Sequence, residues 1–343
     1  MVRILLLLLA FLTMAVSNAS AQVTAFIYHR VGDSRYPTTN VDTNRFREEM
    51  AYLLANKYQV LPLSQVVDAL KEKKPLPERA VVLTFDDGYR SVYKNAWPVL
   101  KSFGYPFTVF LYTQATDSGW PDHMTWNQVR EMRAAGVDFQ DHGYGHLRFG
   151  TAPPGLDDQA NRSRIRSDLI KSGRLMAQNL GEGPSYLALP YGEYNRTVLE
   201  EVKKLGYEAV FTQDPGAISA ETDPYRIPRE PIVGREWSTM DHFEMVLKRV
   251  DLPFTAMEPD IVPLATPVPQ RFAVRLLHPE RYQPNSLGIY VTELGWQKAT
   301  LSGNVLSVPN RKPLTKRENR VAVSGREKES GRTAIRFWML FKE

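Results

Sequence analysis

Short apolar runs and amphipathic segments alternate along the first 250 residues of the chain. An unbroken apolar run is typical of a strand buried on both faces, and a repeat of 3.6 residues is typical of a helix that packs on a sheet. Val81-Val82-Leu83 and Phe107–Leu111 are runs of the first kind. The segment after Thr43 is of the second kind, because its apolar residues from Phe46 to Leu54 share one helical face, and Thr43 is expected to be its N-cap. This alternation predicts repeated βα units and therefore a parallel sheet.

The other elements of this part follow from the same patterns. Thr125–Gln128 matches a capping box, which predicts a helix that ends at Gly136. We expect further strands at residues 58–61, 137–140, 185–188 and 209–211, and further helices after Ser64, up to Phe103, over Ile165–Leu180, up to Leu205 and from Ser238 to about Val250. Reactive side chains follow several of these strands, which favours a (β/α) barrel.

The last third of the chain has a different pattern. Residues 253–269 are rich in proline and have the composition of a linker. Beyond them, alternation predicts strands at Phe272–Leu276, Gly288–Val291 and Thr333–Phe341, with polar hairpins or loops over Asn304–Arg332. We therefore expect a main α/β domain at residues 22–252 and a small β-sandwich-like domain at residues 270–343.

Residues 1–21 have the features of a secretory signal. Arg3 precedes an apolar core from Ile4 to Val16, and Ala19-Ser20-Ala21 is an A-x-A cleavage site before Gln22. An uncleaved anchor is the less favoured alternative, because the apolar core is short for a membrane span. We therefore expect a periplasmic or secreted protein. The chain has no cysteine, which excludes disulfides and thiolate chemistry.

Charge is distributed unevenly along the chain. From Ile261 onward there are 14 Lys or Arg residues and 6 Asp or Glu residues, a net charge of +8, whereas the whole chain carries +5. A basic C-terminal part predicts contact with an anionic surface such as lipopolysaccharide, or with a polymer. A solvated basic face without a partner is the alternative. The sequence contains no nucleic-acid-binding motif, and the export signal argues against a nucleic-acid partner.

Two adjacent carboxylates stand where the apolar run Val81-Val82-Leu83 ends, in the segment Thr84-Phe85-Asp86-Asp87-Gly88. The two charges repel each other, so that one carboxylate needs a cation while the other can act as a base. The alternative is an Asp-Asp-Gly turn without chemistry.

Two histidines, His142 and His146, follow the strand expected at residues 137–140. Gly143 and Gly145 favour a loop, which can direct both rings toward one ion. Two imidazoles and one carboxylate form a three-ligand site with an open position, as in a catalytic metal centre. Two loop histidines with local hydrogen bonds are the alternative.

The third segment, Pro190-Tyr191-Gly192, follows the strand expected at residues 185–188. Such residues are ordinary in a turn. The turn also leaves backbone N–H groups free to face a pocket, as an oxyanion-binding site requires.

Together and in this order, the three segments resemble the polysaccharide deacetylase (NodB-homology) family of carbohydrate esterases, over about residues 23 to 240. The resemblance implies a distorted (β/α) barrel. The opening segment Phe26–Val31 resembles the periplasmic branch that deacetylates poly-N-acetylglucosamine, in which a Tyr-His supplies the catalytic acid. Here that acid is His29, for which a buried core histidine is the alternative.

The resemblance implies a metal-dependent hydrolase that removes N-acetyl groups from an N-acetylglucosamine-containing polysaccharide. It assigns Asp86 as the base and His29 as the acid. It assigns Asp87, His142 and His146 as ligands of one divalent ion, with zinc expected first and iron, cobalt or nickel also compatible with these donors. Peptidoglycan or a chitin-like glycan as the substrate, and a barrel that binds polysaccharide without catalysis, are the alternatives.

The substrate side of the predicted site comes from aromatic residues and the turn. Pro190 and the N–H of Tyr191 are expected at the oxyanion. Trp126, Tyr144 and Tyr194 are expected to line a sugar groove, although each of them could belong to the core instead.

The chain departs from the family pattern at two positions. Ala188 stands where many members have an arginine that pairs with the base. Arg226 or Arg229 could take that role, and an exposed structural arginine is the alternative for both. Gly143 stands where a Ser or Thr usually follows the first metal histidine. Neither change removes a ligand or the base.

Overall fold

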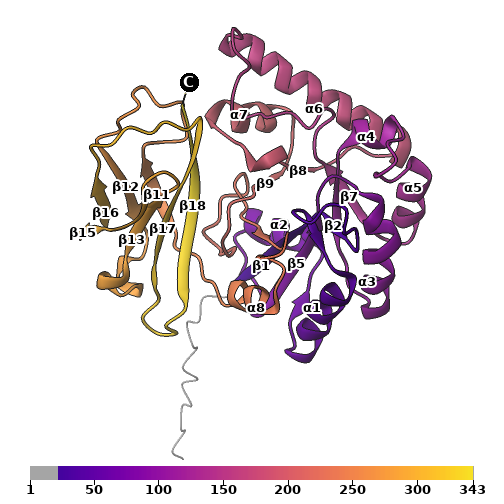
Figure 1. The fold of residues 1–343 in the computed structure, drawn as a ribbon, viewed down its shortest axis with the longest axis horizontal. Coiled ribbons are helices and arrows are strands. Elements are labelled where there is room, and N and C mark those ends of the chain that lie inside the picture. Colours follow the sequence, from indigo (N-terminus) through magenta and orange to yellow (C-terminus); the bar gives the residue numbers. More distant parts are fainter. Residues whose placement is uncertain (1–21, 343) are drawn as a thin grey trace, which may run out of the picture.

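Eight parallel strands form the central sheet of the computed structural model, which describes residues 22–342. The export signal predicted at residues 1–21 therefore lies outside the described residues. The strand order is β10-β1-β5-β6-β7-β8-β9, with β4 paired to β5, and the sheet curls into an incomplete barrel (Figure 1). The strands are β1 (Val23–Tyr28), β4 (Gln59–Val60), β5 (Ala80–Phe85), β6 (Thr108–Leu111), β7 (Asp138–Asp141), β8 (Tyr186–Ala188), β9 (Ala209–Phe211) and β10 (Glu230–Pro231). The predicted parallel sheet is thus confirmed.

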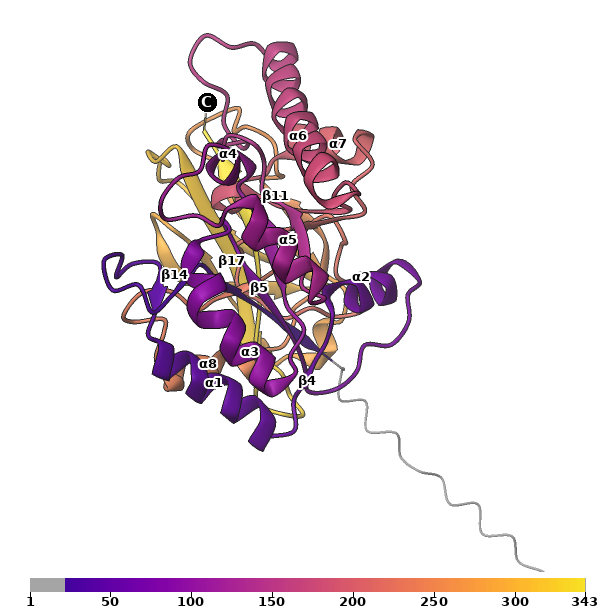
Figure 2. The same cartoon turned by 90° about the vertical axis from the view of Figure 1, so that its right-hand side faces the viewer.

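Helices cover the outer side of this sheet, and Figure 2 shows α1, α3, α5 and α6 in front of it. The helices are α1 (Thr43–Ala55), α2 (Leu63–Lys71), α3 (Trp97–Phe103), α4 (Thr113–Asp117), α5 (Trp126–Ala134), α6 (Asp158–Leu180), α7 (Arg196–Lys204) and α8 (Met240–Leu247). A small parallel pair, β2 (Arg30–Val31) and β3 (Asn40–Val41), lies above β1. Among residues 22–342, none of these helices has the length and apolar character that a membrane crossing requires.

The helix ends show which capping signals in the sequence correctly predicted where a helix begins. The capping box at Thr125 is present, with Thr125 and Gln128 bonding reciprocally. The cap of α1 is Asp42 rather than Thr43, because the Asp42 carboxylate accepts from the N–H groups of Asn44 and Arg45. Leu54 was expected on the buried face but is 62% exposed, since it lies one position beyond the stripe that packs inward.

Helix α1 places a carboxyl group, Glu49, against the core next to β1. Glu49 is fully buried, and the Tyr28 hydroxyl donates a hydrogen bond of 2.9 Å to its Oε2. Burial raises the pKa of Glu49 from 4.5 to about 8, although the hydrogen bond from Tyr28 opposes this shift. The folded protein therefore holds a proton that the unfolded chain gives up at much lower pH.

Because the folded protein holds this proton, its free energy of unfolding is expected to fall as the pH rises. The folded-state pKa lies above that of the unfolded chain, so the contribution is complete below pH 4.5 and is lost as the pH rises to about 8. We expect a loss on the order of 5 kcal/mol across this window. Glu49→Gln should remove that loss, as measured by urea unfolding at several pH values. Glu78→Gln is the control, because Glu78 is exposed and is not among the charges that shift the pKa of Glu49; this variant should keep the slope of the parent. The same pH dependence in Glu49→Gln and the parent would contradict the assignment.

Two antiparallel sheets follow the barrel and pack face to face as a sandwich. One has the order β11-β12-β16-β15 and the other β14-β13-β17-β18. Their strands are β11 (Phe254–Glu258), β12 (Arg271–Leu276), β13 (Gly288–Val291), β14 (Gly295–Lys298), β15 (Thr300–Ser302), β16 (Val305–Pro309), β17 (Glu318–Arg326) and β18 (Thr333–Phe341). The β-sandwich-like C-terminal part that the alternation predicted is thus present.

Two details of this part differ from expectation. β11 lies inside the stretch expected as a linker, because residues 254–258 pair with β12. The flanking prolines, Pro253 and Pro259, fall outside this ladder. β17 lies inside the stretch expected as polar hairpins or loops, and it pairs with β18 over its whole length. The domain boundary itself stays a prediction.

A continuous core joins the barrel to the C-terminal sheets. One cluster of buried side chains contains Leu187 and Val198 of the barrel together with Trp338 and Phe341 of β18. Figure 1 shows β18 as the strand of the sandwich next to the barrel. Backbone hydrogen bonds cross the seam at Val250, which donates to Thr333 and accepts from Ile335. The sheets are therefore packed against the barrel rather than attached by a free linker.

Candidate active site

The two carboxylates lie at the carboxyl end of β5. Asp86 is completely buried and its N–H donates to the Tyr28 carbonyl (2.9 Å), so the end of β5 stays paired with the end of β1. Asp87 has a left-handed backbone, with φ of 69°, and Gly88 follows with φ of 71°. This turn directs the two side chains differently, and a Cβ at Gly88 would lie 2.7 Å from a Leu111 methyl carbon.

Asp87, His142 and His146 converge on one point. Asp87 Oδ1 lies 3.4 Å from His142 Nε2 and 3.2 Å from His146 Nε2. One ligand atom from each residue lies within 4.8 Å of the others, a spacing that suits a shared metal ion. Burial opposes ionisation of Asp87, but the contacts with the two histidines lower its pKa well below the ordinary value. The structure therefore brings the three predicted ligands together.

The donor atoms are prepared for a cation. His142 Nδ1 lies 2.8 Å from the Ala188 carbonyl, to which it donates in the tautomer that leaves Nε2 free. Among the described residues, Asp87 Oδ1 and His142 Nε2 are buried without a hydrogen-bond partner. Buried polar atoms rarely lack partners, so two that face each other are suited to binding a metal ion between them. Ala188, where the family pattern has an arginine, thus orients a ligand through its backbone.

Two buried acids that the sequence analysis did not assign hold the histidine loop. Asp141 accepts from the Gly143 N–H (2.8 Å) and from the Ser172 and Tyr207 hydroxyls. Asp168 on α6 accepts from the N–H groups of Tyr144 (2.9 Å) and Gly145 (2.8 Å). These bonds stabilise a loop in which His146 has φ of 49°. The position of Asp141 beside His142 was the only sequence signal, and Asp168 had none.

Asp86 pairs with Arg229, one of the two arginines considered for this role. Arg229 is fully buried, and its Nη1 and Nη2 donate to Asp86 Oδ1 (2.6 Å) and Oδ2 (2.8 Å). It also donates to Thr84 Oγ1 (3.1 Å) and to the Thr212 carbonyl (2.9 Å). Burial raises the pKa of Asp86, but Arg229 together with His142 and His29 outweighs this effect and keeps the pKa below the ordinary value. Arg226 instead pairs with Asp223 at 3.1 Å.

His29 lies at the carboxyl end of β1, next to the same site. The charges of Asp87, Asp86 and His142 all act on its ring. Burial lowers the pKa of His29, and the two carboxylates offset only part of this shift. Its Nδ1 is buried without a hydrogen-bond partner in the described part of the chain. An imidazole in this position lies close enough to Asp86 and Asp87 to exchange a proton in the same site, and the role of His29 as the acid stays a prediction.

Tyr191 lies in a three-residue 3₁₀ turn, Pro190–Gly192, at the end of β8. Its φ of 60° is left-handed, and its ring is 40% exposed and lies 4.6 Å from the His146 ring. The hydrogen bonds of the turn are donated by Gly192 and Glu193, so the turn does not use the N–H of Tyr191. The predicted oxyanion donor therefore lies beside the proposed ligands.

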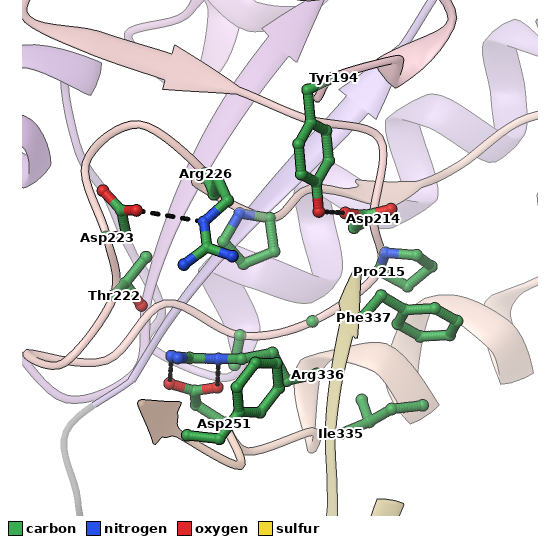
Figure 3. Close-up of a pocket in the computed structure, with 14 residues that line it drawn as sticks. Tyr194, Asp214, Pro215, Thr222, Asp223, Arg226, Asp251, Ile335, Arg336 and Phe337 are labelled. Carbon is green, nitrogen blue, oxygen red and sulfur yellow. Dashed lines mark hydrogen bonds and ion pairs between the residues drawn. The ribbon is translucent and has the colours of Figure 1, made fainter. Parts of the chain in front are cut away.

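The structure places two predicted groove residues elsewhere. Tyr194 is 1% exposed and its hydroxyl donates to buried Asp214 at 2.7 Å, so it belongs to the core rather than to a sugar groove. It follows the turn, but its side chain points into the seam with the C-terminal sheets (Figure 3). Trp126 is half-buried at the start of α5, where its indole N–H donates to Asp117 at 3.3 Å. A substrate role for Trp126 stays a prediction.

Other aromatic side chains surround the site in their place. Tyr112 follows β6 and its ring lies 5.2 Å from the His146 ring. Trp120 is 40% exposed and contacts Tyr112 edge-on, with ring centroids 5.5 Å apart. Buried His123 completes this group, 5.8 Å from Trp120. No pattern in the sequence indicated them, because they come from a loop and a short helix with no periodic signal.

Comparisons with known proteins agree with this geometry. The profile of a family described as polysaccharide deacetylase matches residues 73–210. A poly-beta-1,6-N-acetyl-D-glucosamine N-deacetylase of Escherichia coli (strain K12) is 32% identical over 242 residues, which cover 57% of this chain and 34% of that protein. A protein of the same name from Staphylococcus epidermidis is 30% identical over 232 residues, which cover 66% of this chain and 77% of that protein.

A solved structure is also similar. IcaB from Ammonifex degensii has a TM-score of 0.56 and 26% identity, covering 66% of this chain and 96% of that chain. This similarity confirms the distorted (β/α) barrel. The match to the Escherichia coli relative spans about a third of that protein's length, 34%. The family match ends at residue 210, so the C-terminal sheets lie beyond it.

Proposed function

Since this chain belongs to the polysaccharide deacetylase family, we propose that it hydrolyses N-acetyl groups of a polysaccharide built from N-acetylglucosamine units. The observation that carries the proposal is the cluster of Asp87, His142 and His146 beside a carboxylate, Asp86, that Arg229 keeps ionised. The names of the Escherichia coli and Staphylococcus epidermidis relatives support a poly-β-1,6-N-acetylglucosamine substrate.

Three side chains would hold a divalent ion. One carboxylate and two imidazoles suit Zn²⁺, and Fe, Co or Ni also accept these donors. Such an ion supplies Lewis acidity to the acetamide group and makes a water molecule easier to deprotonate. The buried atoms Asp87 Oδ1 and His142 Nε2 point to the same place as His146 Nε2.

The remaining steps are proton transfers by residues of this chain. Asp86 takes a proton from water as the water oxygen attacks the acetamide carbonyl carbon. The N–H of Tyr191 donates a hydrogen bond to the oxygen that becomes negative. His29, in its protonated form, gives a proton to the sugar nitrogen as the C–N bond breaks, so that acetate and a free amine are released. Arg229 holds the base in place through two hydrogen bonds.

Removal of the metal is expected to remove the activity. The purified protein would be stripped with a chelator, reloaded in turn with Zn²⁺, Co²⁺ or Ni²⁺, and mixed with β-1,6- and β-1,4-linked N-acetylglucosamine oligomers. Acetyl loss would be followed by mass spectrometry. We expect activity only after reloading and a preference for the β-1,6 oligomers. Preference for β-1,4 oligomers would instead indicate a chitin-like or peptidoglycan substrate.

A ligand variant connects this activity to the site. His146→Ala is expected to lose bound metal, measured by elemental analysis, and at least about a hundredfold in kcat/KM, because even residues behind the ligands change affinity by that factor. The control is His278→Ala. His278 belongs to the C-terminal part, is half-exposed, and lies near Glu221 and Glu280. Equal metal content in the two variants would contradict the proposed ligand set.

The anionic-surface contact has no support in the structure. Several cations of the C-terminal part pair with acids within residues 22–342, including Arg271 with Glu258 and Arg336 with Asp251. The excess of positive charge is therefore partly neutralised internally. We propose the polysaccharide as the partner and leave the basic surface unassigned.

A further inference from the structure

A trough lies at the seam between the barrel and the C-terminal sheets, and no role above uses it. It consists of two adjoining grooves of about 340 and 800 Å³. Thr151 and Arg317 line both grooves, so the two grooves adjoin at these residues. The narrower groove is lined by Arg148, Thr151, Glu193, Thr292, Lys316, Arg317 and Glu318. One wall is the loop of residues 148–158 from the barrel, and the other is formed by the C-terminal part.

The narrower groove begins beside the active site. Arg148 lines it, and its guanidinium carbon lies 4.1 Å from the centre of the Tyr191 ring. On its other side, the Tyr191 ring contacts the His146 ring, with 4.6 Å between the two ring centres. A polymer whose reacting unit lies over the proposed ligands can therefore continue past Tyr191 into the groove.

The walls of the trough are held at a fixed distance. Figure 3 shows the seam nearby, where Tyr194 pairs with Asp214 and Arg336 with Asp251, around a space of only about 30 Å³. The ring of Phe341 packs directly on Gly150, where an added Cβ would lie 2.4 Å from it. Arg317 donates to the Ala152 carbonyl across the trough at 2.9 Å. The trough is thus preformed, which reduces the entropy cost of binding.

The lining is suited to an uncharged sugar chain. Acidic and basic side chains alternate, and Arg148 contacts both Glu193 and Glu318, the latter at 3.5 Å. Burial and then Glu318 raise the pKa of Glu193 to about 7, as expected for two neighbouring carboxylates. Glu193 is 1% exposed, and its Oε2 has no hydrogen-bond partner within residues 22–342. Glu193 therefore stabilises the wall of the groove through its contacts with Arg148 and Glu318.

The wider groove adds apolar surface to these polar groups. It is lined by the side chains of Pro153, Pro154, Leu156, Pro263 and Phe341 together with polar residues such as Asn161 and Asn195. Sugars present apolar C–H faces and a rim of hydroxyls, and both find partners here. The mixed charges do not favour a polyanion.

We propose that this trough binds further sugar units of the polysaccharide beyond the unit being deacetylated. The proposal rests on the proposed function for the identity of the polymer. It gives the C-terminal sheets a role in the substrate site, because Thr292, Lys316 and Glu318 all come from them.

The test compares long and short substrates in two variants. Thr151→Trp would fill the point where the two grooves meet, and Glu318→Ala would remove a polar group from the C-terminal wall. For each variant, kcat/KM would be measured on a long and on a dimeric N-acetylglucosamine oligomer. We expect the ratio of the long to the short value to fall about tenfold, mainly through KM. Glu329→Ala, at an exposed turn away from the trough, is the control and should keep the parent ratio.

A binding measurement separates this proposal from the reaction. Titration calorimetry of the long oligomer into the unmutated protein and into both variants needs no turnover. Weaker binding in both variants supports sugar binding in the trough, even if the parent protein releases no acetate. Absence of acetate release would contradict the proposed function but not the binding of sugar in the trough. Unchanged binding together with an unchanged ratio of the long to the short kcat/KM would overturn the proposal that the trough binds sugar units. If Thr151→Trp fails to fold, as shown by circular dichroism, Glu318→Ala decides by the same two criteria.

Discussion

Asp86→Asn is expected to reduce acetyl release by about three orders of magnitude, because the general base contributes on the order of 10²–10⁴ to such reactions. Asn keeps the size of the side chain but cannot accept a proton from water. The three proposed ligands are unchanged, so the metal content should stay at the parent value. The expected result is therefore a fall in kcat at constant metal content, measured by mass spectrometry of the oligomer and by elemental analysis.

Two controls make this result specific. Asp68→Asn, on the exposed face of α2, should retain the parent kcat. Asp86→Asn must also be assayed well below its melting temperature, because Arg229 then lacks its carboxylate partner in the core. A variant that keeps full activity while folded would show that another group removes the proton and that Asp86 has a structural role.

The parallel sheet and the main site residues could be predicted because their signals are local. Asp86, His142 and Pro190 each come directly or almost directly after a segment that was expected to be a strand. Parallel strands bring their carboxyl ends to one edge, so residues at these positions meet whatever their separation along the chain. The structure confirms the meeting of Asp87 with His142 and His146.

Arg229 marks the limit of such local signals. Arg226 and Arg229 lie three residues apart, and nothing near them in the sequence distinguishes their directions. The distinction comes from β10, which begins just after Arg229 and pairs with β1 through Phe26 and Glu230. This pairing places the last strand of the sheet in sequence beside the first, and it carries Arg229 inward while Arg226 stays in a turn with Asp223. Long-range pairing of two-residue strands has no periodic signal.

Burial of single side chains was equally hard to predict. Tyr194 and Trp120 are both aromatic, yet the first is in the core and the second is on the rim of the site. In β17 the inward positions include Asn319, which is 2% exposed and donates to Glu293 at 2.8 Å. A polar residue at an inward position hides the alternation by which a strand is recognised. Tertiary contacts decided these cases.

Loss of the buried guanidinium is expected to have the largest effect on stability. Arg229→Met leaves Asp86 in the core with neither hydrogen bond, and an unpaired buried charge costs about 3–5 kcal/mol of unfolding free energy. Urea unfolding would measure this loss. Arg226→Met is the matched control, because its pair with Asp223 is partly exposed and should contribute no more than about 1 kcal/mol. Activity should fall as well, since the base loses its orientation and its ionised form is no longer favoured.

The double variant Asp86→Asn with Arg229→Met tests whether the two residues act as one unit. Each single variant leaves one charge or one donor without its partner, whereas the double variant removes both charges from the core together. We therefore expect it to be more stable than the sum of the single losses predicts, with a coupling of about 2 kcal/mol or more. Additive losses would mean that Arg229 stabilises the fold through Thr84 and Thr212 alone. In that case the ionised state of Asp86 would depend on the histidines and the metal, and Arg229 would not be the functional replacement for the arginine absent at position 188.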